Sequence, residues 1–350
     1  MNRAYRSASY RDSANGIVCA GNWIVDIVHS IDHWPKKNDL ARISDATLGI
    51  GGGAANVTTN LAELSPDLSL FPVGCIGHDD YGRFVLEHLK RLNVGMDHLV
   101  QLPDVETAHT HVMNVVGESR TFFYAGGAND KFSQAHVDIA SLARHQPKLF
   151  YLGYIMLLEQ MDLLRADGRT SAAEILGQAR ENGMITCVDL VSAAHAEYSK
   201  IVAASAPYID YLVLNETEAA RATGIENSPD MKGSLSKAGR TLIASGVNEA
   251  VVIHIPGVAM WADANGDEFW VTAAPIAENE IISPVGAGDA FCSGILFGIH
   301  EGLGPERTMK LAHTLAAANL KVPTANGGIP HKDELPALIG GPIATNTNTK

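Results

Sequence analysis

The apolar residues of the chain fall into short runs that alternate with segments of helical periodicity. The runs are apolar at nearly every position, which predicts strands that are buried on both faces of a sheet. They are Gly16–Gly21, Leu149–Leu152, Met184–Asp189, Tyr211–Leu214 and Ala250–Ile255. After the second run, residues 172, 175, 176 and 179 place apolar side chains on one face of a helix. This rhythm predicts an α/β fold with a central, mostly parallel sheet flanked by helices.

One predicted helix begins with a glycine turn. Phe291, Ile295 and Ile299 recur every fourth residue, and Gly302 marks the end of the pattern. The helix is therefore expected to begin near residue 288, directly after the turn. Backbone N–H groups at a helix start have no helical partner, and the helix dipole is positive there. The turn is predicted to hold an anion.

Asp289 follows directly on this turn, whose residues are Gly286, Ala287 and Gly288. A carboxylate repels a bound phosphate. It makes chemical sense here as a base that takes a proton from an attacking hydroxyl, while the amides stabilise the transferring phosphoryl group. An Asp in a first helical turn also stabilises the helix without any part in catalysis. The stretch by itself leaves both interpretations open.

The sequence Gly-Ala-Gly-Asp-Ala-Phe at 286–291 resembles the signature of the ribokinase-like (PfkB) carbohydrate kinases, usually Asp-Thr-x-Gly-Ala-Gly-Asp-x-Phe. The resemblance implies that Asp289 is the catalytic base, that the turn is the anion hole and that ATP is the phosphoryl donor. Ser283 and Pro284 stand where the signature has Asp and Thr. Those two positions help to shape the nucleotide and monovalent-cation surroundings in the family, so activation by potassium stays open.

A second signature of the same family, Gly-Gly-x-x-x-Asn before a helix, is matched by Gly52, Gly53 and Asn56. Glycines let the backbone approach a sugar closely, and an Asn side chain offers a donor and an acceptor to a hydroxyl group. Asp26 follows the first predicted strand and resembles the family's Asp that binds substrate hydroxyls. The resemblance implies that these four residues bind the acceptor. The structural alternatives are a tight glycine turn and a solvated loop Asp.

Asn215-Glu-Thr-Glu218 directly follows a predicted strand and resembles the family's Asn-x-x-Glu motif. Residues i and i+3 share a face at a helix start, so Asn215 and Glu218 are expected to hold Mg²⁺ near the ATP phosphates, with Glu218 acting through water. The alternative is a helix that Asn215 simply caps. By analogy with the family, Asn319, in a helix predicted over 305–322, lies near the adenine of ATP.

The resemblance extends from about Gly16 to Gly328 and includes several motifs in the family's order. It implies one ribokinase-like α/β domain over residues 15–335. The ends of the chain, 1–14 and 340–350, are expected to be flexible tails.

A small β-sheet lid is implied as well, built from two segments at about 27–50 and 103–127. The first has no helical period and is expected to be irregular with short strands. In the second, residues 109–116 and 120–124 predict a hairpin around Gly117-Glu118. Its aromatic and apolar side needs a partner surface, which is the rest of the lid, the sugar or a second subunit, so a homodimer through the lid is one of the expectations.

Composition narrows the class of partner. Of the 350 residues, 46% are hydrophobic and 19% charged, as in a globular chain with a substantial core. The formal net charge is −13 without a polybasic run, which argues against a nucleic acid or an anionic membrane as partner. Cys19, Cys75, Cys187 and Cys292 lie far apart in apolar stretches and are expected to be reduced, buried thiols of a cytoplasmic protein.

Two functions fit these motifs. The first is transfer of the ATP γ-phosphoryl group, with Mg²⁺, to a hydroxyl of a sugar or sugar-like alcohol, expected to be a primary one. The second is a ribokinase-like protein that senses a sugar or nucleoside without transferring phosphate. Ser283, Pro284 and the exit of the strand at His254–Pro256, where the family usually has Thr-x-Gly-x-x-Gly, motivate this alternative. Asp289 favours the kinase, since a sensor needs no base. The acceptor stays open among ribose, fructose, a keto-deoxy sugar acid and a nucleoside.

Overall fold

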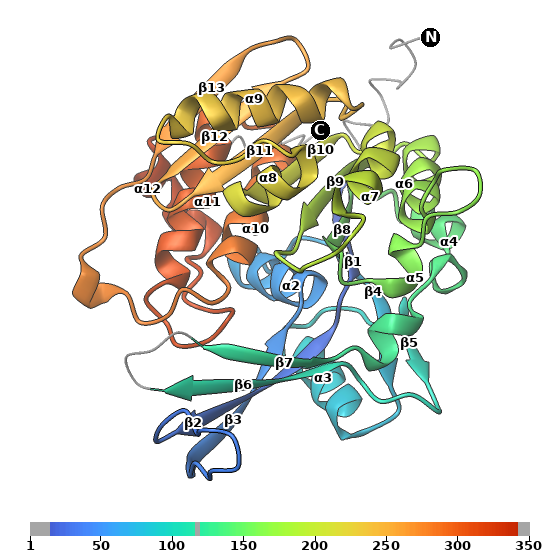
Figure 1. Ribbon diagram of the computed structural model, residues 1–350. Coiled ribbons are helices and arrows are strands. Elements are labelled where there is room, and N and C mark those ends of the chain that lie inside the picture. Colours follow the sequence, from blue (N-terminus) through green and yellow to red (C-terminus); the bar gives the residue numbers. More distant parts are fainter. Residues whose placement is uncertain (1–14, 116–119, 342–350) are drawn as a thin grey trace.

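The centre of the computed structural model, which describes residues 15–115 and 120–341, is a nine-stranded sheet (Figure 1). Its strands are β1 (Ile17–Gly21), β4 (Leu70–Gly77), β5 (Leu99–Leu102), β8 (Leu149–Ile155), β9 (Ile185–Leu190), β10 (Tyr211–Asn215), β11 (Ala250–Ile255), β12 (Val258–Asp263) and β13 (Glu268–Thr272). Their order is β13-β12-β11-β10-β9-β8-β1-β4-β5. Only β12 pairs antiparallel, with β11 and β13. The predicted mostly parallel sheet is confirmed.

Helices cover both faces of this sheet. On one face the core includes side chains of α2 (Gly53–Leu64), α10 (Ala287–His300), α11 (Pro305–Asn319) and α12 (Leu335–Ile339). On the other it includes side chains of α4 (Ile139–Ala143), α5 (Glu159–Asp162), α6 (Ser171–Glu181), α7 (Tyr198–Ser205), α8 (Glu216–Thr223) and α9 (Met231–Ala244). Within β8, Leu149 and Tyr151 join the first core and Phe150 and Leu152 the second. Successive strand residues point to opposite faces, which explains why the strands read as continuous apolar runs.

The remaining elements are short or lie beside the sheet. The helix α3 (Asp80–Arg91) packs in a third, smaller core with residues near the start of α2. The 3₁₀ turns are η1 (Gly127–Lys131), η2 (Gln134–His136), η3 (Ala206–Tyr208), η4 (Glu278–Glu280) and η5 (Lys332–Glu334). In the part of the chain that the structure describes, no helix has both the length and the apolar character needed to cross a membrane. All four cysteines are buried free thiols.

A separate four-stranded sheet forms the lid below the main sheet in Figure 1. It contains β2 (Ile24–Ile31), β3 (Ile43–Gly51), β6 (His109–Val115) and β7 (Thr121–Ala125), in the order β3-β2-β6-β7. The expectation of an irregular first segment is wrong: β2 and β3 are strands of eight and nine residues that pair antiparallel. β2 pairs with β3 on one side and with β6 on the other, and this pairing stabilises the two strands although their periodicity is weak. The predicted hairpin of β6 and β7 is confirmed, while its turn at Gly117-Glu118 lies outside the described residues, as does most of the predicted tails.

The lid exposes several large apolar side chains. Trp34, Leu48, Phe122 and Phe123 each leave about half of their surface in solvent, and the rings of Trp34 and Phe123 stack at 6.4 Å. Such side chains favour a partner surface. A homodimer through the lid stays a prediction.

A packing prediction concerns Gly294, at the contact between α10 and α11. A Cβ atom there would overlap the Ala312 backbone, with the Ala312 nitrogen 2.8 Å away. Although Ala favours helix more than Gly does, we expect Gly294→Ala to lower the free energy of unfolding by about 1–3 kcal/mol, because overpacking forces the helices apart. Urea unfolding measures this. As a control, Gly95→Ala, whose Cβ would meet only the Asp97 carboxylate at 4.0 Å, should change stability by less than about 0.5 kcal/mol. Equal stability of the two variants would contradict the prediction.

Candidate active site

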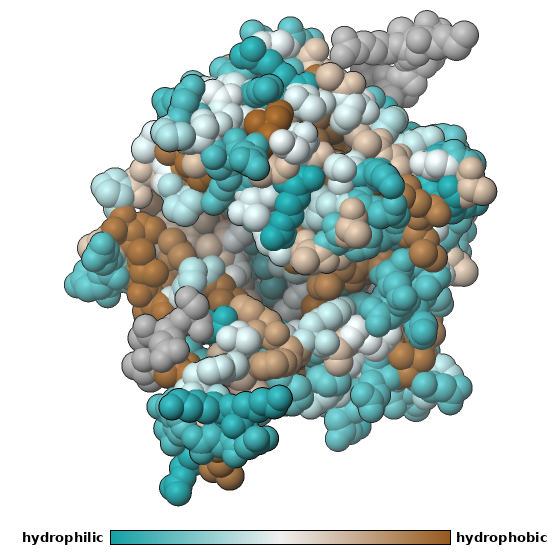
Figure 2. All heavy atoms as spheres, viewed as in Figure 1, coloured by the Kyte–Doolittle hydropathy of each residue, from teal (hydrophilic) through white to brown (hydrophobic). Residues whose placement is uncertain are grey.

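The glycine turn, Asp289 and the Asn215–Glu218 motif come together at the carboxyl ends of β9 and β10, the edge where parallel sheets bind ligands. A cavity of about 240 Å³ lies there. It is lined by Tyr154, Asp189, Leu190, Val191, Ser192, Val213, Leu214, Asn215, Glu218, His254, Gly286, Gly288, Asp289 and Cys292. Figure 2 shows this side of the molecule hollowed between the lid and the main sheet.

The glycine turn opens α10 in a conformation that requires glycine. Gly286 is the N-cap residue with φ 86°, and a Cβ atom there would overlap the carbonyl oxygen of Ala325. The helix begins at Ala287, one residue before the predicted start at Gly288. Within the described residues, the backbone N–H groups of Gly288 and Asp289 have no hydrogen-bond acceptor in the protein. They remain available to an anion at the positive end of the helix dipole.

Asp289 is buried, with 5% of its surface exposed. Its Oδ1 accepts a hydrogen bond from the Tyr154 hydroxyl at 2.7 Å, and its Oδ2 accepts one from Asn56 Nδ2 at 2.9 Å. Burial raises its pKa to about 6; the two hydrogen bonds oppose this rise, and the nearby charges of Asp26 and Glu218 add to it. A carboxyl with this pKa is ionised at neutral pH and still accepts a proton readily, as a general base must.

The second signature lies beside the first because α2 and α10 pack together. Gly52 is the N-cap of α2 with φ 92°, and a Cβ atom there would be 2.6 Å from the Asn22 carbonyl oxygen. At Gly53, a Cβ atom would be 2.7 Å from Cδ1 of Tyr154. The structural alternative, a tight glycine turn at the start of α2, is therefore correct. The same close approach of the two helices brings Asn56 to Asp289.

Asp26 lies within the lid strand β2, so the alternative of a solvated loop Asp is wrong, and its binding to an acceptor stays a prediction. Its carboxylate lies against Gly51, where a Cβ atom would overlap it. Burial raises the pKa of Asp26 to about 6, against the effects of a hydrogen bond with Thr110 and of the Arg120 charge. The lid thus carries a carboxylate whose negative charge helps to raise the pKa of Asp289.

Asn215 and Glu218 form a capping box at the start of α8, so the capping interpretation is confirmed. Asn215 Oδ1 accepts from the Glu218 N–H and Glu218 Oε2 accepts from the Asn215 N–H, both at 2.9 Å. Glu218 Oε1 also accepts from Ser192 Oγ at 2.8 Å. Burial is the main cause that raises the pKa of Glu218. Both residues nevertheless line the cavity, so capping and ligand binding are compatible here.

The donor set fits a magnesium ion bound through water rather than a closed metal cage. Among the residues that the structure describes, no three His, Cys, Asp or Glu side chains are grouped to hold a metal. Asp189, Glu218 and Asp289 nevertheless line one cavity, and each carboxylate oxygen has a second lone pair. Mg²⁺ commonly keeps several waters and binds through one or two carboxylates and the phosphates of its substrate.

Asn319 is not brought to this cavity. Its side chain is buried at the end of α11, where Nδ2 donates to the Ala325 carbonyl at 3.4 Å. Ala325 is the residue that crowds Gly286, so Asn319 contacts the glycine turn through this loop. Its role at adenine stays a prediction.

Tyr154 and Asn326 are site residues that sequence reasoning missed. Tyr154 contacts Asp289, and Asn326 Nδ2 donates to Asn56 Oδ1 at 3.0 Å. A Tyr at the end of an apolar strand carries no signal of this role. Asn326 is followed by Gly327-Gly328, and this polar residue beside two glycines could have indicated a loop that approaches a ligand. His254 also lines the cavity, with its ring 4.6 Å from that of Phe291. Burial lowers the pKa of His254 to about 4, so it is neutral.

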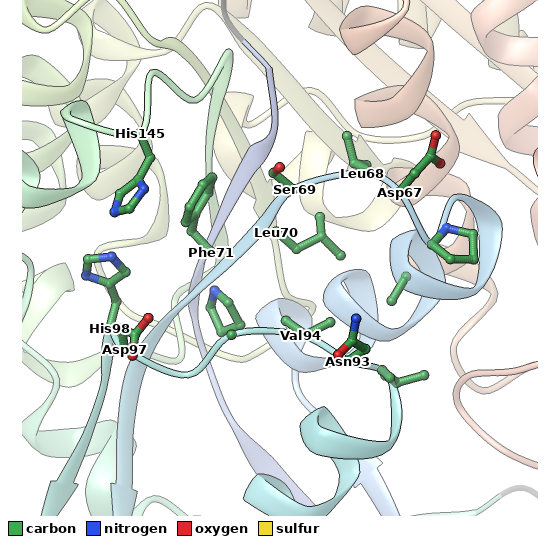
Figure 3. Close-up of a pocket in the computed structure, with 15 residues that line it drawn as sticks. Asp67, Leu68, Ser69, Leu70, Phe71, Asn93, Val94, Asp97, His98 and His145 are labelled. Carbon is green, nitrogen blue, oxygen red and sulfur yellow. The ribbon is translucent and has the colours of Figure 1, made fainter.

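A larger cavity, of about 410 Å³, lies at the opposite edge of the sheet (Figure 3). It is lined by residues 66–72, 92–95, 97 and 98 and by Ala62 and His145. His98 and His145 face each other there beside Phe71, with the two imidazole centroids 6.0 Å apart. None of the predicted site residues lines it.

Comparison with known proteins identifies the family and the fold. Residues 14–332 match the pfkB family carbohydrate kinases. The chain is 24% identical over 304 residues to an adenosine kinase of Schizophyllum commune, covering 83% of this chain and 84% of that protein. It is 25% identical over 321 residues to a ribokinase of Schizosaccharomyces pombe, covering 90% and 94%. The structure of Arabidopsis thaliana ribokinase complexed with ribose and ATP superposes with a TM-score of 0.74 at 21% identity, over 93% of this chain and 99% of that one. The chain belongs to the pfkB family of carbohydrate kinases.

Proposed function

We propose that this ATP-dependent kinase phosphorylates a primary hydroxyl group of a sugar or nucleoside, with Asp289 as general base. The observation that supports this most is the position of Asp289, which is buried at the start of α10, next to two backbone N–H groups without protein acceptors. The relatives named above include ribokinase and adenosine kinase, so we favour an acceptor that contains ribose, free or within a nucleoside.

In the proposed reaction the acceptor oxygen attacks the γ-phosphorus of ATP and its proton passes to the Asp289 carboxylate. The bond between the γ-phosphorus and the bridging oxygen breaks, and ADP leaves with that electron pair. Of the predicted anion hole at 286–288, the Ala287 N–H donates to the Pro284 carbonyl at 3.4 Å, so the unpaired N–H groups of Gly288 and Asp289 are the ones that stabilise the charge on the transferring group in this proposal. Glu218 and Asn215 would hold Mg²⁺ through water, and the ion would supply positive charge beside the phosphates.

Residues from two elements orient the acceptor in this proposal. Gly52, Gly53 and Asn56 come from the start of α2, and Asp26 comes from the lid. Because the lid carries one of these groups, its closure over an acceptor completes the site and excludes water. The hydroxyl-binding groups then hold the reacting oxygen next to Asp289.

Replacing the base is the first test. We expect Asp289→Asn to lower kcat by about two to four orders of magnitude, because the amide cannot take the proton. ADP release from Mg-ATP is measured across ribose, fructose, sugar acids and nucleosides, with potassium varied, while the exposed Asp267→Asn serves as the matched control. Nearly unchanged turnover in Asp289→Asn would exclude the base role. Saturable binding of an acceptor without turnover in the wild type would instead favour the sensor.

The pH dependence follows from the raised pKa values. Asp289 must be ionised to act as base, and its pKa is about 6, so the protonated, inactive fraction grows as the pH falls through this value. Asp26 has the same pKa, so a second proton contributes. We expect kcat/KM to be constant above about pH 7 and to fall steeply below about pH 6. A profile that stays flat down to about pH 4.5 would contradict this assignment.

Magnesium binding is tested at Glu218. Glu218→Gln keeps the capping box, since Gln still accepts from the Asn215 N–H, but it removes the negative charge that faces the cavity. We expect the Mg²⁺ concentration for half-maximal velocity to rise by about tenfold or more, with little change in the unfolding temperature. Glu216→Gln, on the same helix but not lining the cavity, is the control. The same Mg²⁺ response in both variants would argue against this role.

A further inference from the structure

Tyr154 covers the carboxylate that the proposed reaction needs. Its hydroxyl lies 2.7 Å from Asp289 Oδ1, while Asn56 occupies Oδ2. The tyrosine ring packs on Gly53, where no side chain would fit. With Asp289 almost fully buried and Tyr154 lining the same cavity, the hydroxyl stands where an acceptor oxygen has to arrive.

The backbone at Tyr154 is strained. Its φ is 59°, and two residues later Met156 has φ 89°. Residues other than glycine rarely adopt positive φ, and such a conformation persists only where the surrounding contacts hold it in place. The end of β8 therefore needs contacts that hold it in this conformation.

Two buried carboxylates supply these contacts. Asp189 Oδ1 accepts from the Tyr154 N–H at 2.9 Å. Asp162 Oδ2 accepts from the N–H groups of Met156 at 3.0 Å and Leu158 at 2.9 Å. Burial raises the pKa of Asp189, and it raises that of Asp162 to about 7, so holding the segment is costly in itself. Together these contacts hold the end of β8 in the conformation that directs the Tyr154 side chain toward Asp289.

Tyr154 cannot replace Asp289 as base. Burial and the adjacent Asp289 charge raise the pKa of its phenol well above the ordinary value, so the hydroxyl stays protonated and acts as a donor to the carboxylate. A donor on the reactive oxygen competes with any other hydroxyl for the same lone pair. Water and acceptor must both displace it.

We propose that Tyr154 is a positioning residue that shields Asp289 from water until an acceptor hydroxyl displaces the tyrosine hydroxyl, which suppresses wasteful hydrolysis of ATP. The inference rests on the proposed function, because it assumes that Asp289 is the base. In the suppressed reaction a water oxygen attacks the γ-phosphorus, its proton passes to Asp289, and ADP leaves with the electron pair of the broken phosphorus–oxygen bond.

The test is ADP release from Mg-ATP without any acceptor. Tyr154→Phe leaves a space the size of a hydroxyl group next to Asp289, which a water molecule can fill. We expect acceptor-independent hydrolysis to rise by about tenfold or more, the factor for one hydrogen bond to a charged group. The double variant Tyr154→Phe/Asp289→Asn should lose this gain.

Controls separate the inference from loss of structure. Tyr211→Phe makes the same change at the amino end of β10, whereas the site lies at the carboxyl end of this strand. It should leave hydrolysis unchanged. Tyr154→Met, which also lacks the hydroxyl but adapts its shape, replaces Tyr154→Phe if thermal unfolding shows that the latter does not fold.

The outcomes are distinct. Hydrolysis that does not rise in a folded Tyr154 variant overturns the inference, as does a rise that persists in the double variant. Failure of the proposed function is recognised separately, by acceptor-dependent turnover that survives Asp289→Asn alone.

Discussion

The structure depends on the burial of one carboxylate at a helix start. Asp289 lies at the positive end of α10, and two donors from distant parts of the chain, Asn56 and Tyr154, fix its orientation. Burial raises its pKa to about 6, so the ionised form is less stable in the folded protein than in the unfolded chain. This cost is present at neutral pH and is lost as the pH falls from about 6 toward 3.8. The packing of α10 against α2 and α11 must offset it.

Close approach of backbones makes this burial feasible. Gly286 allows the loop at Ala325 to contact the glycine turn, and Gly53 accommodates the ring of Tyr154. Gly294 brings α11 against α10 in the same way. A larger side chain at any of these positions would push the two backbones apart. The packing of the domain and the geometry around Asp289 therefore both require glycine there. The glycine turn, where the phosphoryl group is expected, belongs to the large domain, and the separate sheet of the lid carries Asp26, which is expected to bind the acceptor.

The departures from the family signature lie just before the glycine turn and at the exit of β11. Ser283 is buried, with its hydroxyl accepting from the Val285 N–H at 3.2 Å, and thus serves the local turn. The strands β11 and β12 are joined by Pro256 and Gly257 alone. His254, neutral and packed on Phe291, lines the cavity beside this turn. These changes leave Asp289 and its two donors in place.

The sequence by itself determined the parallel sheet, the hairpin of the lid, and the two motifs that open α2 and α10, because these follow from local periodicity, glycine conformation and helix capping. It also indicated Asp289 as a candidate base. Tertiary structure decided the rest. Asp26 lies in a strand because pairing with β3 and β6 stabilises an extended segment that has little periodicity of its own. Tyr154 and Asn326 reach the site only through contacts with residues far away in the chain, and Asn319 is buried by a loop that no local pattern describes. Such contacts depend on how β8, α2 and α10 pack, and packing between distant segments leaves no mark on local periodicity.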